Sequence, residues 1–242
     1  MQKKGVVILD FGSQYTQLIA RRVRELNVYS EILSSNTHLS QIIERDPSAI
    51  ILSGGPSSVF GDEAPSFDKK IFDIDIPILG ICYGLQLLAH HHGGLVESNG
   101  QGEYGFAKIE VDDDKKLFQN VSKSSQVWMS HMDRVTKLPD GWHTLAHSSN
   151  GVIAAMANKN QTRVATQFHP EVAHSKEGKN ILKNFLFNIS NCSANWTAEN
   201  IVEQKVKLIR EKVGESNILV GVSGGVDSTV VAALIHKAVG PQ

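Results

Sequence analysis

Cysteine is scarce in this sequence of 242 residues, which contains only Cys82 and Cys192, far apart along the chain. Two distant cysteines do not make the disulfide framework of a small secreted domain. The apolar run at 6–9 is too short for the core of a secretory signal. No apolar run approaches the roughly 20 residues that a membrane-spanning helix needs. These absences predict a soluble protein of the reducing cytoplasm, without a membrane partner.

An excess of charge of either sign is also absent, since 24 Lys and Arg residues face 25 Asp and Glu residues. A chain without a basic cluster is a poor candidate for binding nucleic acid, so no such partner is expected. Apolar residues make up 41% and charged residues 20%, which is typical of a folded globular protein. At roughly 150 residues per domain, the length lies between one and two domains.

Short apolar runs alternate with segments of helical periodicity in the first part of the chain. The apolar runs predict strands at 6–9, 28–33, 49–52 and 76–81, and the periodic segments predict helices at 15–26, 37–45 and 84–92. This alternation is typical of a largely parallel sheet that is covered by helices on both faces.

The pattern then changes to strands without helices between them. They are expected at 106–111, 126–131, 142–148, 152–157 and 163–168, followed by a helix at 176–189. These strands form either an antiparallel extension of the first sheet or a ribbon folded against it. The predicted fold class is therefore α/β, with an open, mostly parallel sheet and an antiparallel extension.

A polar segment at 191–196 predicts a boundary between a first domain, 1–195, and a second segment, 196–242. The second segment is expected to contain a helix at 197–213, a strand at 218–222 and a helix at 229–238. It is too short for a core of its own. We therefore expect it to be poorly ordered, or ordered only by packing on a neighbour.

Cys82 lies where a predicted strand meets a predicted helix, in the sequence Gly80-Ile81-Cys82-Tyr83-Gly84-Leu85-Gln86. A nucleophile on such a sharp turn is exposed at the end of the sheet, and its neighbours must be small where the backbone is pinched. The helix N-terminus brings a positive dipole end to the sulfur, which favours the thiolate. The flanking glycines favour this interpretation over an inert, buried cysteine.

A thiolate nucleophile needs a base and a group that orients the base. The sequence His169-Pro170-Glu171 follows the predicted strand at 163–168. Residues two apart on an extended segment point the same way, so Glu171 can bind one ring nitrogen and leave the other for Cys82. The turn Ser53-Gly54-Gly55-Pro56 and the N–H of Tyr83 offer amide donors for an oxyanion.

These three motifs resemble those of the class I, or triad, glutamine amidotransferases, in that family's order and over about residues 5–190. The resemblance implies a flavodoxin-like fold and hydrolysis of glutamine to glutamate and ammonia through a thioester, without a cofactor. It implies that Cys82 is the nucleophile, His169 the base and acid, and Glu171 the orienting group. It further implies oxyanion amides at Gly55 and Tyr83, and glutamine-binding residues at Gln86, Ser130 and His131.

A second motif, Ser223-Gly224-Gly225-Val226-Asp227-Ser228, opens the last predicted helix. Backbone amides in such a loop form an anion-binding nest, which the helix dipole reinforces. The hexapeptide resembles the pyrophosphate loop of the N-type ATP pyrophosphatases. The resemblance implies that this hexapeptide and Thr229 bind ATP, and that Asp227 lies near Mg²⁺.

A glutaminase joined to this loop is similar to glutamine-dependent synthetases that act on purine nucleotides. The resemblance implies that the first domain supplies ammonia, and that a complete second domain uses ATP and Mg²⁺ to aminate xanthosine monophosphate. Most of that domain, and a C-terminal domain through which such enzymes form homodimers, are expected to be missing from these 242 residues. This piece is therefore expected to be at most a glutaminase.

Two other functions stay open on the sequence alone. A triad hydrolase of other γ-glutamyl amides would use the same three residues, although the loop at 223–228 argues against it. A catalytically silent nucleotide-binding or regulatory module would contain an inert Cys82. A metal site at His90-His91-His92 is disfavoured, because adjacent positions on a helix point to different faces.

Overall fold

The computed structural model describes residues 5–61 and 63–240, without the side chains of 99–101. By their contacts the residues fall into two compact units, 1–193 and 194–242. Within the described residues of the first unit, nine strands form one sheet in the order β2-β1-β3-β4-β9-β8-β7-β5-β6. They are β1 (Val6–Asp10), β2 (Ser30–Ser34), β3 (Ala49–Leu52), β4 (Ile78–Ile81), β5 (Leu95–Val111), β6 (Ser124–Lys137), β7 (Trp142–Ser148), β8 (Ile153–Asn158) and β9 (Arg163–Thr166).

The sheet has a parallel and an antiparallel part. From β2 to β9 the neighbouring strands are parallel, in the flavodoxin-like order, and from β9 to β6 they are antiparallel. The predicted fold class is confirmed, and the antiparallel strands continue the same sheet. β5 and β6 are longer than expected, and they pair with each other along most of their length across two register shifts.

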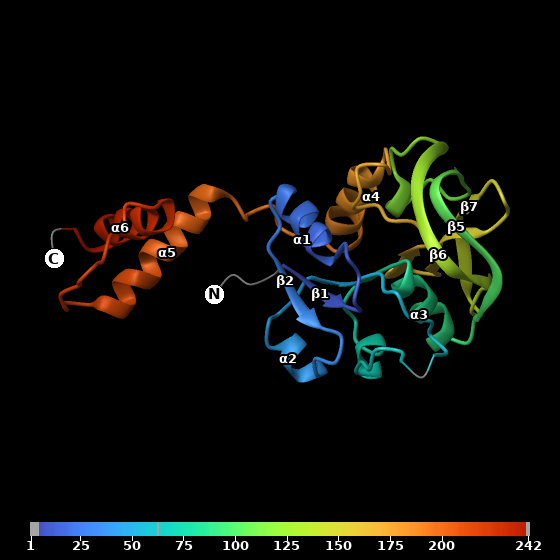
Figure 1. The fold of residues 1–242 in the computed structure, drawn as a ribbon, viewed down its shortest axis with the longest axis horizontal. Helices are drawn as coiled ribbons and strands as arrows, with labels where there is room; N and C mark the ends of the chain where they lie inside the picture. Colours follow the sequence, from blue (N-terminus) through green and yellow to red (C-terminus); the bar gives the residue numbers. More distant parts are fainter. Residues whose placement is uncertain (1–4, 62, 241–242) are drawn as a thin grey trace. The chain divides into compact units, whose positions relative to one another are not determined.

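Helices cover both faces of the parallel strands. They are α1 (Thr16–Glu25), α2 (Leu39–Ile43), α3 (Tyr83–His91) and α4 (Gly178–Asn184), and α4 continues into a π-helical turn, Phe185–Ile189. Single 3₁₀ turns lie at Lys69–Phe72 and Lys116–Phe118. Alternate strand residues enter two cores, one shared with α1 and α4 and the other with α2 and α3 (Figure 1). The continuous apolar runs of the sequence therefore fill both faces of the sheet.

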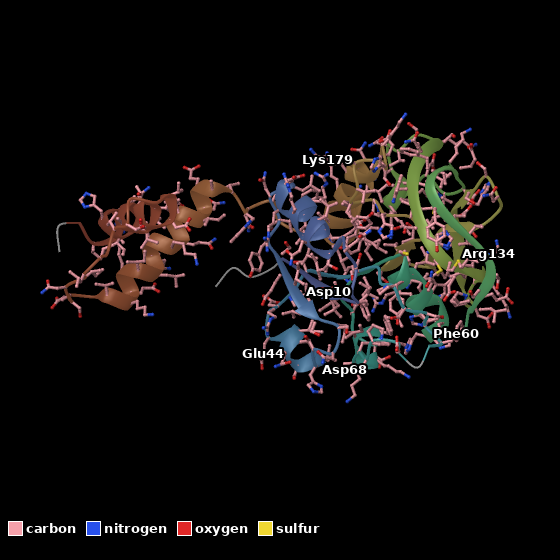
Figure 2. All side chains as sticks on the ribbon, viewed as in Figure 1. Asp10, Glu44, Phe60, Asp68, Arg134 and Lys179 are labelled. Carbon is pink, nitrogen blue, oxygen red and sulfur yellow. The ribbon has the colours of Figure 1, made fainter. Side chains whose placement is uncertain are left out.

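The second unit contains two helices, α5 (Ala198–Val213) and α6 (Val226–Val239). The predicted strand at 218–222 is wrong: these residues form no strand, and Leu219 is fully exposed. A strand needs a neighbour for its N–H and C=O groups, and the described part of this unit offers none. Val206 and Ala238 are buried, whereas many other side chains project into open space (Figure 2). No helix among the described residues is long and apolar enough to cross a membrane.

Glycines allow α3 to begin directly after β4. A Cβ atom at Gly80 would lie 2.5 Å from the carbonyl oxygen of Gly84, and one at Gly84 would lie 2.6 Å from that of Leu52. Both obstacles are backbone atoms, which cannot turn aside as a flexible side chain can. The close approach places the N-terminus of α3 at the end of the sheet, where Cys82 lies.

We expect Gly84→Ala to lower the free energy of unfolding by about 1–3 kcal/mol, because the added methyl group overpacks the contact between α3 and β3. Urea denaturation measures the change. Gly61→Ala is the matched control, since the nearest atom to its Cβ would be the Ser58 oxygen at 3.5 Å. Equal stability of the two variants would contradict this account of the turn.

Candidate active site

Cys82 occupies a strained turn between β4 and α3. Its backbone angles are φ 53° and ψ −102°, which are unfavourable for a residue that carries a Cβ atom. Its N–H donates to the carbonyl of Thr166 in β9, at 2.8 Å, which ties the turn to the sheet. The residue is 4% exposed and lines a cavity of about 670 Å³. Such strain in a cavity wall is typical of functional residues.

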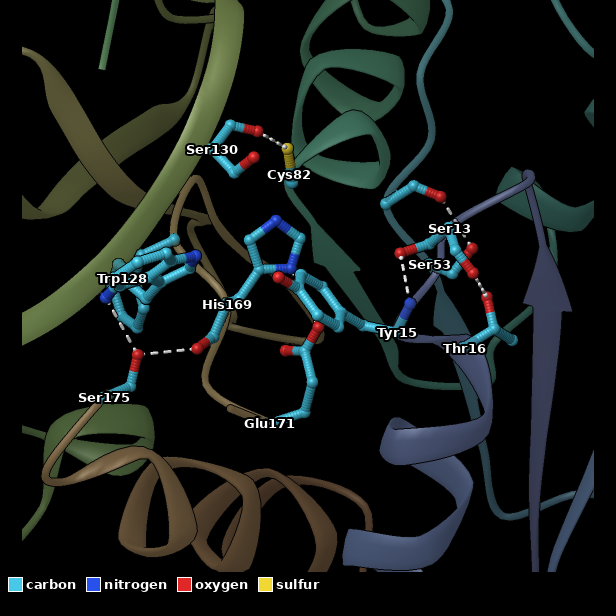
Figure 3. A network of polar contacts seen from close by, with 12 residues as sticks. Ser13, Tyr15, Thr16, Ser53, Cys82, Trp128, Ser130, His169, Glu171 and Ser175 are labelled. Carbon is cyan, nitrogen blue, oxygen red and sulfur yellow. Dashed lines mark hydrogen bonds and ion pairs between the residues drawn. The ribbon is translucent and has the colours of Figure 1, made fainter. Parts of the chain in front are cut away.

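The cavity brings together most of the predicted site residues. Its wall includes the predicted Cys82, His169, Gln86, Ser130, His131 and Gly55, together with Tyr15, Tyr104 and Asp133. Glu171 lies behind His169, away from the cavity (Figure 3). The side chain of Tyr83 packs on Phe11, at 5.3 Å between ring centroids, so only its backbone can serve the site.

His169 and Glu171 form a buried pair. The Nδ1 atom of His169 lies 2.8 Å from Oε1 of Glu171, and the two residues are 3% and 1% exposed. The ring of Tyr15 packs edge-on against the imidazole at 5.0 Å between centroids. A carboxylate only accepts, so Nδ1 carries the hydrogen and Nε2 is left for the cavity side. Figure 3 shows the imidazole between Cys82 and Glu171.

The pair fixes the charge of the imidazole. Burial alone would lower the pKa of His169, but the Glu171 carboxylate and the neighbouring Cys82 outweigh burial and raise it to about 10. These interactions favour the charged form of the imidazole. An imidazolium beside a sulfur stabilises a thiolate, and it can later release a proton to a leaving group.

The sulfur of Cys82 has two further polar contacts. It donates to the carbonyl of Ser130 in β6 at 3.5 Å, and it lies 3.7 Å from the side-chain amide of Gln167. Cys192, by contrast, is buried away from the cavity, and burial raises the pKa of its thiol to about 12. Cys82 alone of the two cysteines has the surroundings of a nucleophile.

Two amides are available beside the sulfur. The N–H groups of Gly55 and Tyr83 take part in no hydrogen bond with another described residue. A Cβ atom at Gly54 would lie 3.1 Å from the His169 ring and 3.6 Å from the Cβ of Cys82. The glycine turn after β3 therefore lies directly against Cys82 and His169, where the predicted oxyanion site requires it.

Gln86 and His131 line the cavity and share one hydrogen-bond acceptor. Their side-chain nitrogens lie 2.8 and 3.0 Å from the same acceptor, the carbonyl oxygen of Asp133. The second ring nitrogen of His131 lies 3.3 Å from Glu103. Burial, the largest effect, lowers the pKa of His131 although Glu103 opposes it. These predicted substrate-binding residues thus shape the wall as well as line it.

The sequence reasoning missed Asp133 and Glu103. Asp133 is 8% exposed, and its carboxylate has no hydrogen bond or ion pair with another described residue. It lies two positions after His131 on β6, so strand periodicity was the signal that could have found it. Glu103 has no such signal, because its partners Ser148 and Asn150 are distant in sequence.

The three consecutive histidines of α3 pack with aromatic rings. His91 contacts Phe72 at 4.4 Å and His92 contacts Trp142 at 5.2 Å between centroids. Burial lowers the pKa of both histidines. No group of three metal-ligating side chains occurs in the part of the chain that the structure describes.

The glycine-rich loop lies at the N-terminus of α6 and is exposed. Gly224 has φ +83°, a conformation that favours glycine, and the hydroxyl oxygens of Ser223 and Ser228 are 3.1 Å apart. Thr229 donates to the carbonyl of Gly225 at 2.9 Å. Hydroxyl groups and helix-terminal amides are donors that suit a phosphate, and Asp227 in the first turn adds a carboxylate that suits Mg²⁺.

Known proteins match both parts of this chain. The family model "Glutamine amidotransferase class-I" matches residues 7–189, and the model "NAD synthase" matches residues 198–242. A GMP synthase [glutamine-hydrolyzing] of Brachyspira hyodysenteriae is 51% identical over 98% of this chain and 46% of its own length. That of Fusobacterium nucleatum is 50% identical over 100% and 47%. The chain thus spans about half the length of these relatives.

The fold has solved counterparts as well. The crystal structure of a glutamine amidotransferase from Thermotoga maritima matches with a TM-score of 0.58 at 20% identity. The match covers 98% of this chain and 97% of that chain, and at this identity it supports the fold alone. The family model, by contrast, covers well over half of the chain and includes all three triad positions. This chain belongs to the class I glutamine amidotransferases.

Proposed function

We propose that this chain hydrolyses glutamine to glutamate and ammonia, as the glutaminase part of a GMP synthase. The observation that carries the proposal is the position of Cys82, on a strained turn beside the buried His169–Glu171 pair. In the whole protein, the ammonia would aminate xanthosine monophosphate with ATP. Relatives named GMP synthase, matched along nearly the whole chain, support that assignment.

The residues suggest a two-step acyl transfer. The thiolate of Cys82 attacks the side-chain amide carbon of glutamine, and the N–H groups of Gly55 and Tyr83 stabilise the oxyanion. His169 gives its proton to the departing ammonia, which leaves a glutamyl thioester. The imidazole then takes a proton from water, which hydrolyses the thioester and frees glutamate. Glu171 orients the ring and stabilises its charged form throughout.

Polar groups in the cavity suit the amino-acid end of glutamine. The carboxylate of Asp133, which has no partner among the described residues, suits the α-amino group. Gln86, Ser130 and His131 line the adjoining wall and would hold the rest of the substrate. Because the amide must reach Cys82 while the amino group stays near Asp133, the cavity favours glutamine over smaller amides.

The loop at 223–229 is proposed to bind the phosphates of ATP in the whole protein. Its exposed hydroxyl groups and the amides at the start of α6 suit that role, and Asp227 would contribute to Mg²⁺ binding. ATP supplies the adenylyl group that activates the nucleotide substrate. We further propose cytoplasmic localisation and a homodimer for the whole protein, and no nucleic-acid partner.

We expect Cys82→Ala to reduce glutamate release from glutamine by more than about 10⁴-fold, because the nucleophile is lost. Enzymatic glutamate detection measures the rate. Cys192→Ala, which removes the other thiol, should keep wild-type activity and labelling by an electrophilic glutamine analogue. In a chain that carries the remaining synthetase residues, Cys82→Ala should aminate xanthosine monophosphate with ammonia but not with glutamine. Unchanged glutamate release would overturn the mechanism.

Glu171→Gln should lower the pKa of His169 from its value of about 10, because the carboxylate charge that raises it is removed. The His169 ring signals in an NMR titration, assigned with His169→Asn, measure this. Since the folded pKa is raised, the imidazolium stabilises the fold fully below about pH 6.5 and less as the pH rises toward 10. Glu177→Gln, on the same segment but away from the ring, should leave the titration midpoint of the His169 ring unchanged. Equal midpoints in the two variants would contradict the His169–Glu171 pair.

Asp133→Asn should raise the KM for glutamine about 10- to 100-fold, as expected for loss of a charge-assisted hydrogen bond. Glutaramate, which lacks the α-amino group, provides the matched substrate. The KM for glutaramate should change less than about twofold between wild type and variant, because this substrate has no amino group for Asp133 to bind. An equal rise for both substrates would show that Asp133 only supports the cavity wall.

A further inference from the structure

The backbone of His169 is held by a side chain outside the cavity. Its N–H donates to the carbonyl of Trp128 in β6 at 3.0 Å. The hydroxyl of Ser175 accepts from the N–H of Trp128 at 3.1 Å and donates to the carbonyl of His169 at 2.6 Å. Ser175 is 5% exposed and does not line the cavity. Figure 3 shows this hydroxyl bridging the two main chains.

This bridge replaces a missing strand pairing. β9 ends at Thr166 and pairs with β4 and β8. His169 therefore lies beyond the end of β9 and contacts β6 without belonging to a strand. One direct backbone bond to Trp128 remains, and Ser175 supplies the other through its hydroxyl. Without it, the half-buried N–H of Trp128 and the buried C=O of His169 would both lose this partner.

The backbone of Glu171 is held in the same way from α1. The Nε atom of Arg22 donates to the carbonyl of Glu171 at 2.9 Å. The same guanidinium pairs with Glu25 at 2.8 Å, which fixes its direction along the helix. Arg22 does not line the cavity either. The main-chain carbonyls of both triad partners thus receive a hydrogen bond from a side chain.

β6 sets the separation between base and nucleophile. Trp128 holds the backbone of His169, and two residues further along, the carbonyl of Ser130 accepts from the sulfur of Cys82. The distance from imidazole to sulfur therefore depends on how firmly His169 is fixed to Trp128. A shift of about 1 Å in such a geometry can cost about 100-fold in rate.

From these contacts we propose that Ser175 and Arg22 are positioning residues, which hold the backbone of His169 and Glu171 so that the imidazole stays between the thiol and the carboxylate. Neither touches the substrate. The proposal rests on the proposed glutaminase function for its kinetic readout, and on the ionisation of the His169 ring for a readout that needs no substrate.

Ser175→Ala tests the first contact in the 242-residue chain. We expect kcat for glutamine hydrolysis to fall about 10- to 100-fold while KM changes less than about twofold, because the cavity wall is untouched. The NMR titration midpoint of the His169 ring should fall below that of wild type, since the ring moves away from Glu171. Ser175→Thr keeps the hydroxyl and should restore both values toward wild type.

Ser30→Ala is the matched control. Ser30 is also fully buried, and its hydroxyl also donates to a backbone carbonyl, that of Ala20 at 3.2 Å, far from the cavity. It should lose stability in urea denaturation but keep kcat and the ring midpoint. A folded Ser175→Ala protein that behaves like Ser30→Ala in both readouts overturns the role of Ser175.

Arg22→Ala tests the second contact, with Arg21→Ala as its control. Arg21 pairs with the same Glu25 at 3.0 Å but does not reach Glu171. We expect lower kcat and a lower ring midpoint only for Arg22→Ala; equal values in the two variants reject the role of Arg22. A wild-type chain that hydrolyses no glutamine would refute the proposed function, and the ring midpoints would then still decide this inference.

Discussion

The backbone of Cys82 is the constraint on which the cavity depends. A residue with a Cβ atom adopts φ 53° and ψ −102° only where the surrounding structure enforces it. Here a hydrogen bond to Thr166 fixes one side of the turn, and the close contact of Gly84 with Leu52 fixes the other. The turn aims the thiol out of the sheet and leaves the N–H of Tyr83, at the helix start, without a hydrogen bond to another described residue. The proposed nucleophile and the proposed oxyanion donor are thus two consequences of one strained residue.

A strained cysteine alone would not make the proposed catalytic site, and the antiparallel part of the sheet supplies the other residues. The parallel strands place Cys82 and the turn at Gly55 along one edge, as in other open α/β sheets. β6 then lines the cavity from Ser130 to Asp133, and its backbone binds both His169 and the sulfur of Cys82. The antiparallel extension, which interrupts the βαβ alternation of the sequence, therefore contains the strand that contacts both His169 and Cys82.

Sequence patterns could reveal those parts of the site whose partners are close along the chain. Glycines two positions either side of Cys82 indicate the pinched turn, and the spacing of His169 and Glu171 indicates their hydrogen bond, which the structure contains at 2.8 Å. Ser175 and Glu103 left no such trace, because a partner of each lies far away in the sequence: Trp128 is 47 positions from Ser175, and Ser148 is 45 positions from Glu103. The pairing of β5, β6 and β7 brings Glu103 to its partner, and the fold of the segment after β9 brings Ser175 to Trp128. The lengths of β5 and β6 were underestimated for the same reason, since pairing across register shifts is a property of two strands.

The predicted strand at 218–222 does not form, for the same physical reason that the other predicted strands do. Its residues are as β-prone as those of β3, yet a β-branched or apolar run becomes a strand only against a partner that pairs its backbone and covers its side chains. β3 has β1 and β4 on either side, whereas Leu219 and Val222 are exposed within a unit whose described residues include no other strand. The loop that follows retains the amides and hydroxyl groups for a phosphate, because these depend only on a helix N-terminus and a glycine with positive φ. The local geometry of the loop thus persists although no strand forms at 218–222.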